Sequence, residues 1–155
     1  MNKKFFYMDP VYFDLINIIF VNIVFFTFYK EATSGPITLR AAIGTPIVLL
    51  SFYFESKASK ALENSHKNPE EIKKLTTSGV YSKIRHPIYL GRILLNAGFL
   101  IIFPIIPMFF VSIAFIIIWY LIALYEERTL MKKFGKKYVS YKKKVPMFIP
   151  KKSAS

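Results

Sequence analysis

Four apolar segments alternate with polar and charged stretches along this chain of 155 residues. They cover about residues 11–29, 37–54, 88–103 and 108–125. A helix of roughly 20 residues crosses the apolar core of a bilayer, so each segment is long enough to span it or nearly so. The pattern therefore predicts an all-α, multi-pass integral membrane protein with about four transmembrane helices. The third segment is short, and we expect it to start within the headgroup region.

The last two apolar segments are separated only by the turn Phe103–Pro107, which is bounded by proline. We expect them to form a tight antiparallel hairpin. After the hairpin, apolar residues recur at spacings of three and four, and lysines largely surround them. These apolar residues are Leu130, Phe134, Tyr138, Tyr141 and Val145. The spacing predicts a basic amphipathic helix that lies on the membrane surface or covers the bundle, with an interruption at Gly135.

Charge is segregated from the apolar segments, although hydrophobic residues make up 54% of the chain and its net charge is +13. The loop at 55–87 holds seven Lys and Arg residues, and after Glu127 come Arg128 and nine lysines without any acid. By the positive-inside rule, this loop and both termini are predicted to be cytoplasmic. The lysines follow no nucleic-acid-binding fold, so we expect the bilayer and not a nucleic acid as the partner.

We interpret the whole chain, 1–155, as one membrane domain. It consists of two N-terminal spans with a cytoplasmic loop (1–78), a core (79–150) and a short tail (151–155). The first span is too long for a cleaved signal peptide and is predicted to be an uncleaved anchor. The chain has no cysteine and two histidines, so no metal site is expected. Phosphate-loop, dinucleotide and serine-hydrolase motifs are missing from the sequence as well.

Two polar clusters flank the predicted hairpin. Arg85-His86-Pro87 comes directly before the third apolar segment, and Glu126-Glu127-Arg128 comes directly after the fourth. An antiparallel hairpin returns the chain to the same membrane face, so the two clusters become neighbours. We expect Glu126 to pair with Arg85, in a site that suits a zwitterionic ligand with an apolar body. A purely structural interpretation is that Pro87 starts a helix and the two glutamates are solvated at a helix end.

Polar and small residues also occur inside the apolar segments. Gly91 and Gly98 lie seven residues apart, almost on one helical face, which favours close packing of another helix. Arg92 and Asn96 are unusual within a span, and they are candidates for function or for pairing with other helices. Their potential partners in the first span are Asp14, Asn17 and Asn22.

In order, the two blocks of motifs resemble the isoprenylcysteine carboxyl methyltransferase family, whose pattern phospholipid N-methyltransferases share. The first block is Gly79-x-Tyr81-x-x-x-Arg85-His86-Pro87-x-Tyr89-x-Gly91, followed by Gly98. The second is Glu126-Glu127-x-x-Leu130-x-x-x-Phe134-Gly135-x-x-Tyr138-x-x-Tyr141, followed by Val145-Pro146 and Ile149-Pro150. Together they cover nearly half of the chain, and the two N-terminal spans carry neither block.

The resemblance implies an S-adenosylmethionine-dependent methyltransferase whose donor binds at the cytoplasmic end of the last two spans, under the C-terminal segment. The residues that match the family's donor site are Tyr81, Arg85, His86, Tyr89, Gly91, Glu126 and Glu127, and we assign Arg85 and Glu126 to catalysis as well. The implied acceptor is hydrophobic or membrane-associated, and a prenylcysteine carboxylate is one candidate. A phospholipid amine and a small thiol are the alternatives.

Other interpretations stay open at this point. Met147 stands where many relatives would have a basic residue, which weakens assignment to a subgroup. Membrane sterol reductases share a similar C-terminal pattern and use a nicotinamide cofactor, but they are considerably longer. The chain is, alternatively, a non-enzymatic membrane protein whose basic tail binds anionic lipid or a partner.

Overall fold

The computed structural model describes residues 10–62, 72 and 74–149, and these residues form helices and connecting loops without any strand. The elements in chain order are α1 (Pro10–Thr27), α2 (Tyr29–Thr33), α3 (Ile37–Ala61), the 3-10 helix η2 (Gly79–Ser82), α4 (Pro87–Ile102), α5 (Ile106–Phe134) and α6 (Lys136–Lys144). The predicted all-α fold class is confirmed. The predicted tail at 151–155 and parts of the basic loop, including Lys67 and Lys73, lie outside the described residues.

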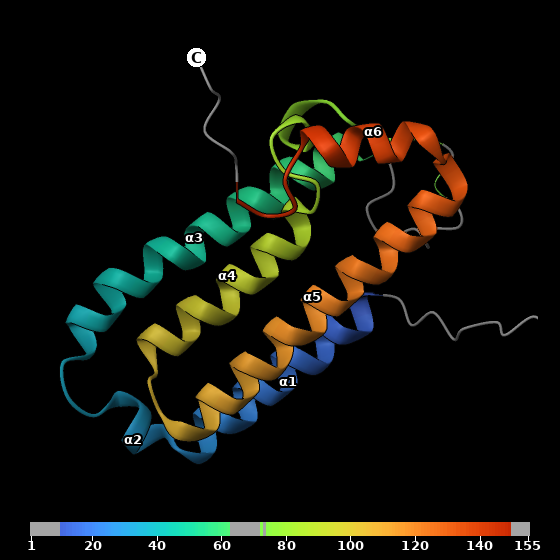
Figure 1. Ribbon diagram of the computed structural model, residues 1–155. Helices are drawn as coiled ribbons and strands as arrows, with labels where there is room; N and C mark the ends of the chain where they lie inside the picture. Colours follow the sequence, from blue (N-terminus) through green and yellow to red (C-terminus); the bar gives the residue numbers. More distant parts are fainter. Residues whose placement is uncertain (1–9, 63–71, 73, 150–155) are drawn as a thin grey trace, which may run out of the picture.

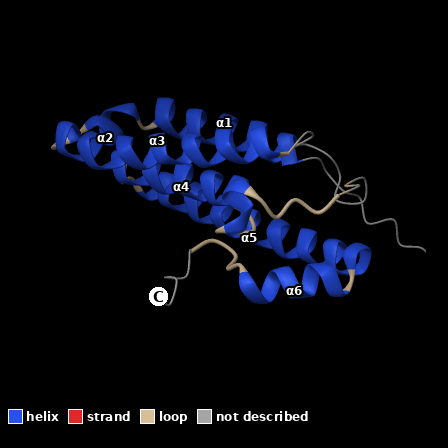
Figure 2. Cartoon of the chain, turned by 90° about the horizontal axis from the view of Figure 1, so that it is seen from above, coloured by secondary structure: helices blue, strands red, loops and turns tan. Residues whose placement is uncertain are grey.

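Four long helices run alternately up and down beside one another (Figure 1). The first residues of α1 and α4 and the last residues of α3 and α5 lie at the same end of the bundle. Both η2 and α6 also lie at this end, which we call the polar end (Figures 1 and 2). The hairpin topology therefore brings the segments before α4 and after α5 together, as the short turn predicted.

Three of the helices, α1, α3 and α5, are long and apolar enough to cross a membrane. Helix α4 is also apolar but has 16 residues, which corresponds to about 24 Å. Large hydrophobic side chains are exposed along the three longer helices, such as Phe26 on α1, Leu49 on α3 and Phe110 on α5. Lipid is the natural environment for such surfaces, and the prediction of a multi-pass membrane protein is confirmed.

Helix α5 extends nine residues beyond the predicted span and ends at Phe134. Its final turns are polar but rich in good helix formers, and Leu130 is buried there against Leu75 and Tyr138. Gly135 has φ 52°, a backbone conformation that favours glycine, and it separates α5 from α6. The predicted interruption is therefore confirmed.

Helices α3 and α4 pack closely along a seam of small residues. A Cβ atom on Gly98 would lie 2.6 Å from Cγ2 of Val48 and 3.2 Å from the carbonyl oxygen of Gly44. A Cβ atom on Gly91 would lie 2.9 Å from the carbonyl oxygen of Ser51 and 2.7 Å from Cγ of Glu55. The spacing of the two glycines thus serves helix packing, as their sequence pattern favoured.

An ion pair joins α1 to α4 inside the bundle. Nη2 of Arg92 lies 2.5 Å from Oδ2 of Asp14, and the guanidinium also lies 4.3 Å from the centroid of the Trp119 ring. Of the other predicted partners, Asn17 is buried, whereas Asn22 is exposed and donates to a carbonyl of its own helix. The polar residues of the first span therefore contribute one charged partner to α4.

Candidate functional site

The two polar clusters meet at the polar end of the α4–α5 hairpin. Arg85 and His86 precede Pro87, the first residue of α4, and His86 is the N-cap residue. Glu126 and Glu127 lie near the end of α5. The proline at this position starts the helix, as the structural interpretation proposed, and it also holds the two cations beside the acids.

Glu127 is the centre of this cluster and is only 2% exposed. Its Oε1 atom accepts from Nε of Arg85 at 2.7 Å and lies 2.6 Å from Nη2 of the same side chain. Its Oε2 atom accepts from Nζ of Lys142 at 2.5 Å. A buried carboxylate needs such partners to offset its desolvation. The expected pairing of Arg85 with Glu126 is wrong, because the guanidinium pairs with Glu127 instead.

Glu126 remains more accessible than its neighbour. Its side chain is 20% exposed, and its Oε2 atom lies 3.5 Å from Nδ1 of His86. This separation is long for a hydrogen bond, whereas the shorter contacts of the cluster all converge on Glu127. Glu126 is therefore the carboxylate of the pair that is better placed to meet a ligand.

His86 lies between the two glutamates, with Nε2 3.3 Å from Oε1 of Glu127 and Nδ1 facing Glu126. Burial alone would lower the pKa of its imidazole. The hydrogen bonds and charges of both carboxylates outweigh this effect and raise the pKa of His86 above its usual value. The cluster therefore favours an imidazolium, which helps to neutralise two adjacent acids.

The segment after α6 is tied over this cluster by the backbone and side chain of Arg85. Nη1 of Arg85 donates to the carbonyl of Lys142 at 3.0 Å and also to the carbonyl of Val145. The backbone N–H of Arg85 donates to the carbonyl of Pro146 at 2.9 Å, and that of His86 donates to Met147. Arg85 thus holds both the central carboxylate and the segment that covers it.

Aromatic side chains form the apolar side of the cluster. The ring of Tyr89 is stacked between His86, at 5.6 Å between centroids, and Trp119, at 6.0 Å. Phe148 approaches His86 at 6.3 Å. Such rings can pack against a planar ligand or a cation beside the charged groups.

Tyr81 is buried in η2 and tied to α6, because its carbonyl accepts from the hydroxyl of Tyr141 at 2.5 Å. Burial, together with the charge of Glu126, raises the pKa of the Tyr81 phenol. The structure therefore brings six of the predicted site residues to one place, at the polar end. Gly91 differs from them, because it faces Ser51 and Glu55 of α3. It belongs to the packing seam and lies one turn into α4.

Lys142 is a site residue that the sequence analysis did not identify. We placed it among the lysines around the apolar stripe of the tail. Tyr138, Tyr141, Lys142 and Val145, however, follow the spacing i, i+3, i+4, i+7 of a single helical face. This register, beside buried Tyr138 and Val145, was the available signal that one lysine faces inward.

The fold and this cluster define a class of protein: a multi-pass membrane protein with a charged, aromatic ligand site at the polar end of a helical hairpin. The phospholipid methyltransferase family matches residues 39–137, which is more than half of the chain. The chain belongs to this family, so it is an integral-membrane protein of a methyltransferase family, as the two motif blocks predicted.

A relative from Arabidopsis thaliana, protein-S-isoprenylcysteine O-methyltransferase B, is 36% identical over 86 residues. The match covers 52% of this chain and 42% of the relative. The chain thus aligns with less than half of the relative's length, and the shared family does not by itself determine the acceptor.

Proposed function

We propose that this protein is an S-adenosylmethionine-dependent methyltransferase that acts on a hydrophobic or membrane-associated acceptor. Membership of the phospholipid methyltransferase family supports the activity. The observation that carries the proposal is the convergence of Arg85 and His86 with Glu126 and Glu127 at one end of the hairpin. We also propose that this polar end faces the cytoplasm, since the basic residues of the chain gather there.

The charges of the cluster suit the donor. S-adenosylmethionine carries a sulfonium and an ammonium against a single carboxylate, so it is a net cation. Glu126 is accessible enough to bind the ammonium. Tyr81 and Tyr89 offer rings for the adenine or the sulfonium. Together with Glu127, Arg85, His86 and Gly91, they make up the proposed donor site.

Lys142 supports this assignment, because it already places an ammonium on Glu127. Its side chain is 40% exposed, whereas that of Glu127 is 3% exposed. The ammonium of a ligand could therefore replace Nζ of Lys142, and the lysine would turn towards water without leaving a buried charge behind. We assign to Lys142 the role of a placeholder for the donor's ammonium.

The donor supplies a methyl group activated by the sulfonium. In the transfer, the acceptor's nucleophile forms a bond to the methyl carbon, and the carbon–sulfur bond breaks with its electron pair going to sulfur. The protein's part is to align the reactants and to exclude water. Arg85 contributes by holding Glu127 and residues 145–147 in place, which makes it a positioning residue. Glu126 is proposed to contact the donor directly.

The acceptor would enter from the bilayer beside the apolar helices. A prenylcysteine carboxylate is supported by the name of the Arabidopsis relative, and a phospholipid amine is supported by the name of the family. Both acceptors combine a nucleophile with an apolar chain. A donor site at the end of membrane-spanning helices accommodates this combination.

Calorimetric titration of the detergent-purified protein with S-adenosylhomocysteine tests the donor site. We expect saturable binding that Glu126→Gln weakens about ten-fold or more, as is usual for a lost charge-assisted contact. Lys143→Gln is the control, since Lys143 is exposed on the same end of the molecule. No saturable binding by folded protein would refute the proposal. Equal losses in both variants would favour the non-enzymatic alternative, in which the basic tail matters and the cluster does not.

A second measurement addresses the acceptor. Membranes that contain the protein are incubated with donor labelled in its methyl group, and lipid and protein products are then separated. Label in the lipid fraction favours an amine of a phospholipid, and base-labile label in the protein fraction favours a carboxyl ester. Membranes with Arg85→Ala protein provide the background.

A further inference from the structure

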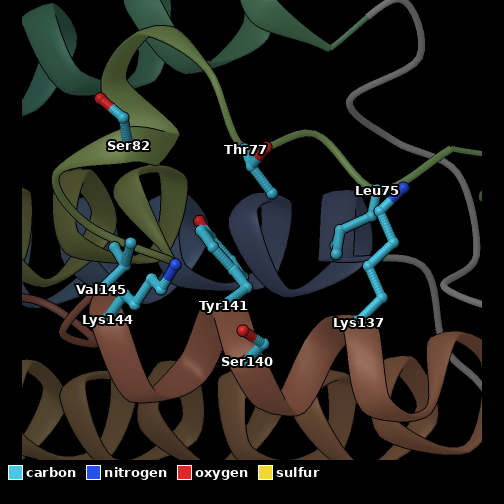
Figure 3. Close-up of a pocket in the computed structure, with 8 residues that line it drawn as sticks. All are labelled: Leu75, Thr77, Ser82, Lys137, Ser140, Tyr141, Lys144 and Val145. Carbon is cyan, nitrogen blue, oxygen red and sulfur yellow. The ribbon is translucent and has the colours of Figure 1, made fainter.

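A pocket of about 620 Å³ lies between α6 and the segment at 75–82 (Figure 3). Its lining residues are Leu75, Thr77, Ser82, Lys137, Ser140, Tyr141, Lys144 and Val145. None of the seven predicted donor-site residues belongs to this lining. The volume is within the range of about 300–1,000 Å³ that small-molecule sites occupy. The pocket is thus a second place where this protein can hold a ligand.

One face of α6 supplies most of the polar lining. Lys137, Ser140, Tyr141 and Lys144 follow the spacing i, i+3, i+4, i+7, so they share a helical face. In Figure 3, Tyr141 reaches from α6 towards the 77–82 segment, with Lys137 on one side and Lys144 on the other. The two lysines are about 10 Å apart along the helix, so their long side chains can approach one ligand from both sides.

The charge of the pocket is entirely positive. The lining contains two lysines and no acidic residue. Among the described residues, neither Lys137 nor Lys144 forms a salt bridge, whereas Lys142 on the neighbouring face is bound to Glu127. Thr77 and Ser140 add hydroxyl groups. The hydroxyls of Ser82 and Tyr141 already donate to the carbonyls of Gly79 and Tyr81.

The base of the pocket is less polar. Leu75 and Val145 are both 8% exposed, and the ring of Tyr141 is half-buried beside them. Lysines and hydroxyls surrounding apolar side chains match an amphiphile with an anionic head, because the lysines can bind phosphate while the apolar groups contact the start of its chain.

We propose that this pocket binds the phosphate headgroup of an anionic phospholipid, at a site distinct from the donor site. The donor is a net cation, and two unpaired lysines would repel it, whereas Glu126 and Glu127 would repel a phosphate. The two faces of α6 thus select ligands of opposite charge. This proposal does not depend on methyl transfer and holds for the non-enzymatic alternative as well.

The test measures binding of phosphatidylglycerol to the full chain in detergent, from the lipid-dependent rise of its unfolding temperature. We expect saturable stabilisation by phosphatidylglycerol and much weaker stabilisation by phosphatidylcholine. The double variant K137Q/K144Q should bind phosphatidylglycerol about ten-fold or more weakly, since it loses two charge-assisted contacts. The matched control, K136Q/K143Q, removes two other exposed lysines of the same tail and should change the affinity by less than about three-fold.

Further arms make each outcome decisive. The double variant K137R/K144R keeps both charges and should retain binding, which separates loss of the site from loss of folding. Equal weakening in the two glutamine variants would show diffuse attraction to the tail and overturn the proposal. Glycerol 3-phosphate that binds as tightly as phosphatidylglycerol would overturn the lipid assignment. Competition by S-adenosylhomocysteine would show that the pocket belongs to the donor site.

Discussion

Helix α4 meets its neighbours in two contrasting ways. Along α3 it forms a close seam in which Gly91 and Gly98 fit against the backbone of Ser51 and Gly44. At its polar end, the residues just before it bind α5 and α6 through charges that converge on Glu127. The seam consists of contacts that any added carbon would disturb, and it contains no group that could act on a ligand.

The contrast indicates a division of labour within one helix. Packing against α3 fixes where α4 lies, and the charged end uses that position to hold the candidate site. Substitutions in the seam should therefore change stability and leave the donor affinity of the folded protein intact. Substitutions at the charged end should change donor binding, and those that bury an unpaired charge should change stability too.

The largest effect is expected for Arg85→Ala. The substitution removes every Arg85 side-chain contact to Glu127 and to the carbonyls of Lys142 and Val145. Breaking a buried pair by removing one partner usually costs about 3–5 kcal/mol of unfolding free energy. We expect this loss together with a fall in S-adenosylhomocysteine affinity of about a hundred-fold or more.

Denaturation in detergent and calorimetry measure these two effects. Arg128→Ala is the control, because Arg128 is exposed on the same stretch of α5. Unchanged affinity in Arg85→Ala would show that the charged end is structural, and the contrast between the two surfaces of α4 would disappear.

Gly98→Ala is expected to act on stability alone. Its Cβ would lie 2.6 Å from a methyl group of Val48, a stiff β-branched side chain, and close to backbone atoms of α3. Overpacking of this kind costs about 1–3 kcal/mol. The unfolding temperature should fall, whereas the S-adenosylhomocysteine affinity measured well below it should not. Ala114→Val enlarges an exposed side chain of α5 and serves as the control. Loss of donor affinity in folded Gly98→Ala protein would contradict the division of labour.

Much of the fold was predictable because apolar length and spacing are local properties of the sequence. The helix starts at Ile37 and Pro87, the turn before Ile106 and the break at Gly135 follow from residues within a few positions of each. The helix ends were less predictable. Helix α5 continues through Glu126 to Phe134 because the polar residues that end a membrane span do not end a helix, and Leu130 finds a buried place there.

The site was predictable as a group of residues but not as a set of pairs. The hairpin required that Arg85 and His86 meet Glu126 and Glu127. Which glutamate faces Arg85 depends on the rotation of α5 about its axis, and adjacent residues of a helix point about 100° apart. The role of Lys142 required knowing that α6 folds back over the cluster, and this is a long-range contact that no local pattern specifies.

A smaller effect, of opposite sign, is expected for Lys142→Met. This substitution removes the ammonium that occupies Oε2 of Glu127 and keeps an apolar stem of similar length. Without this internal competitor, S-adenosylhomocysteine should bind a few-fold to about ten-fold more tightly, provided that Arg85 and His86 still neutralise the carboxylate. Calorimetry measures the change, with Lys143→Met as the control. Weaker binding in Lys142→Met would show that the lysine contacts the donor and does not take its place.

The smallest effect concerns pH and His86. Because the folded state raises the pKa of this imidazole, the folded protein holds a proton that the unfolded chain releases near pH 6.5. The stabilisation is therefore complete below about pH 6.5 and is lost as the pH rises through the raised pKa of the folded state. His86→Gln keeps a hydrogen-bonding side chain without the titration, so its unfolding temperature should depend less on pH above 6.5 than that of the unmodified protein. Parallel melting curves of the two proteins, recorded from pH 6 to 9, measure the difference. Equal slopes would mean that the imidazole stays neutral between Glu126 and Glu127, and the charged end of α4 would then rest on Arg85 and Lys142 alone.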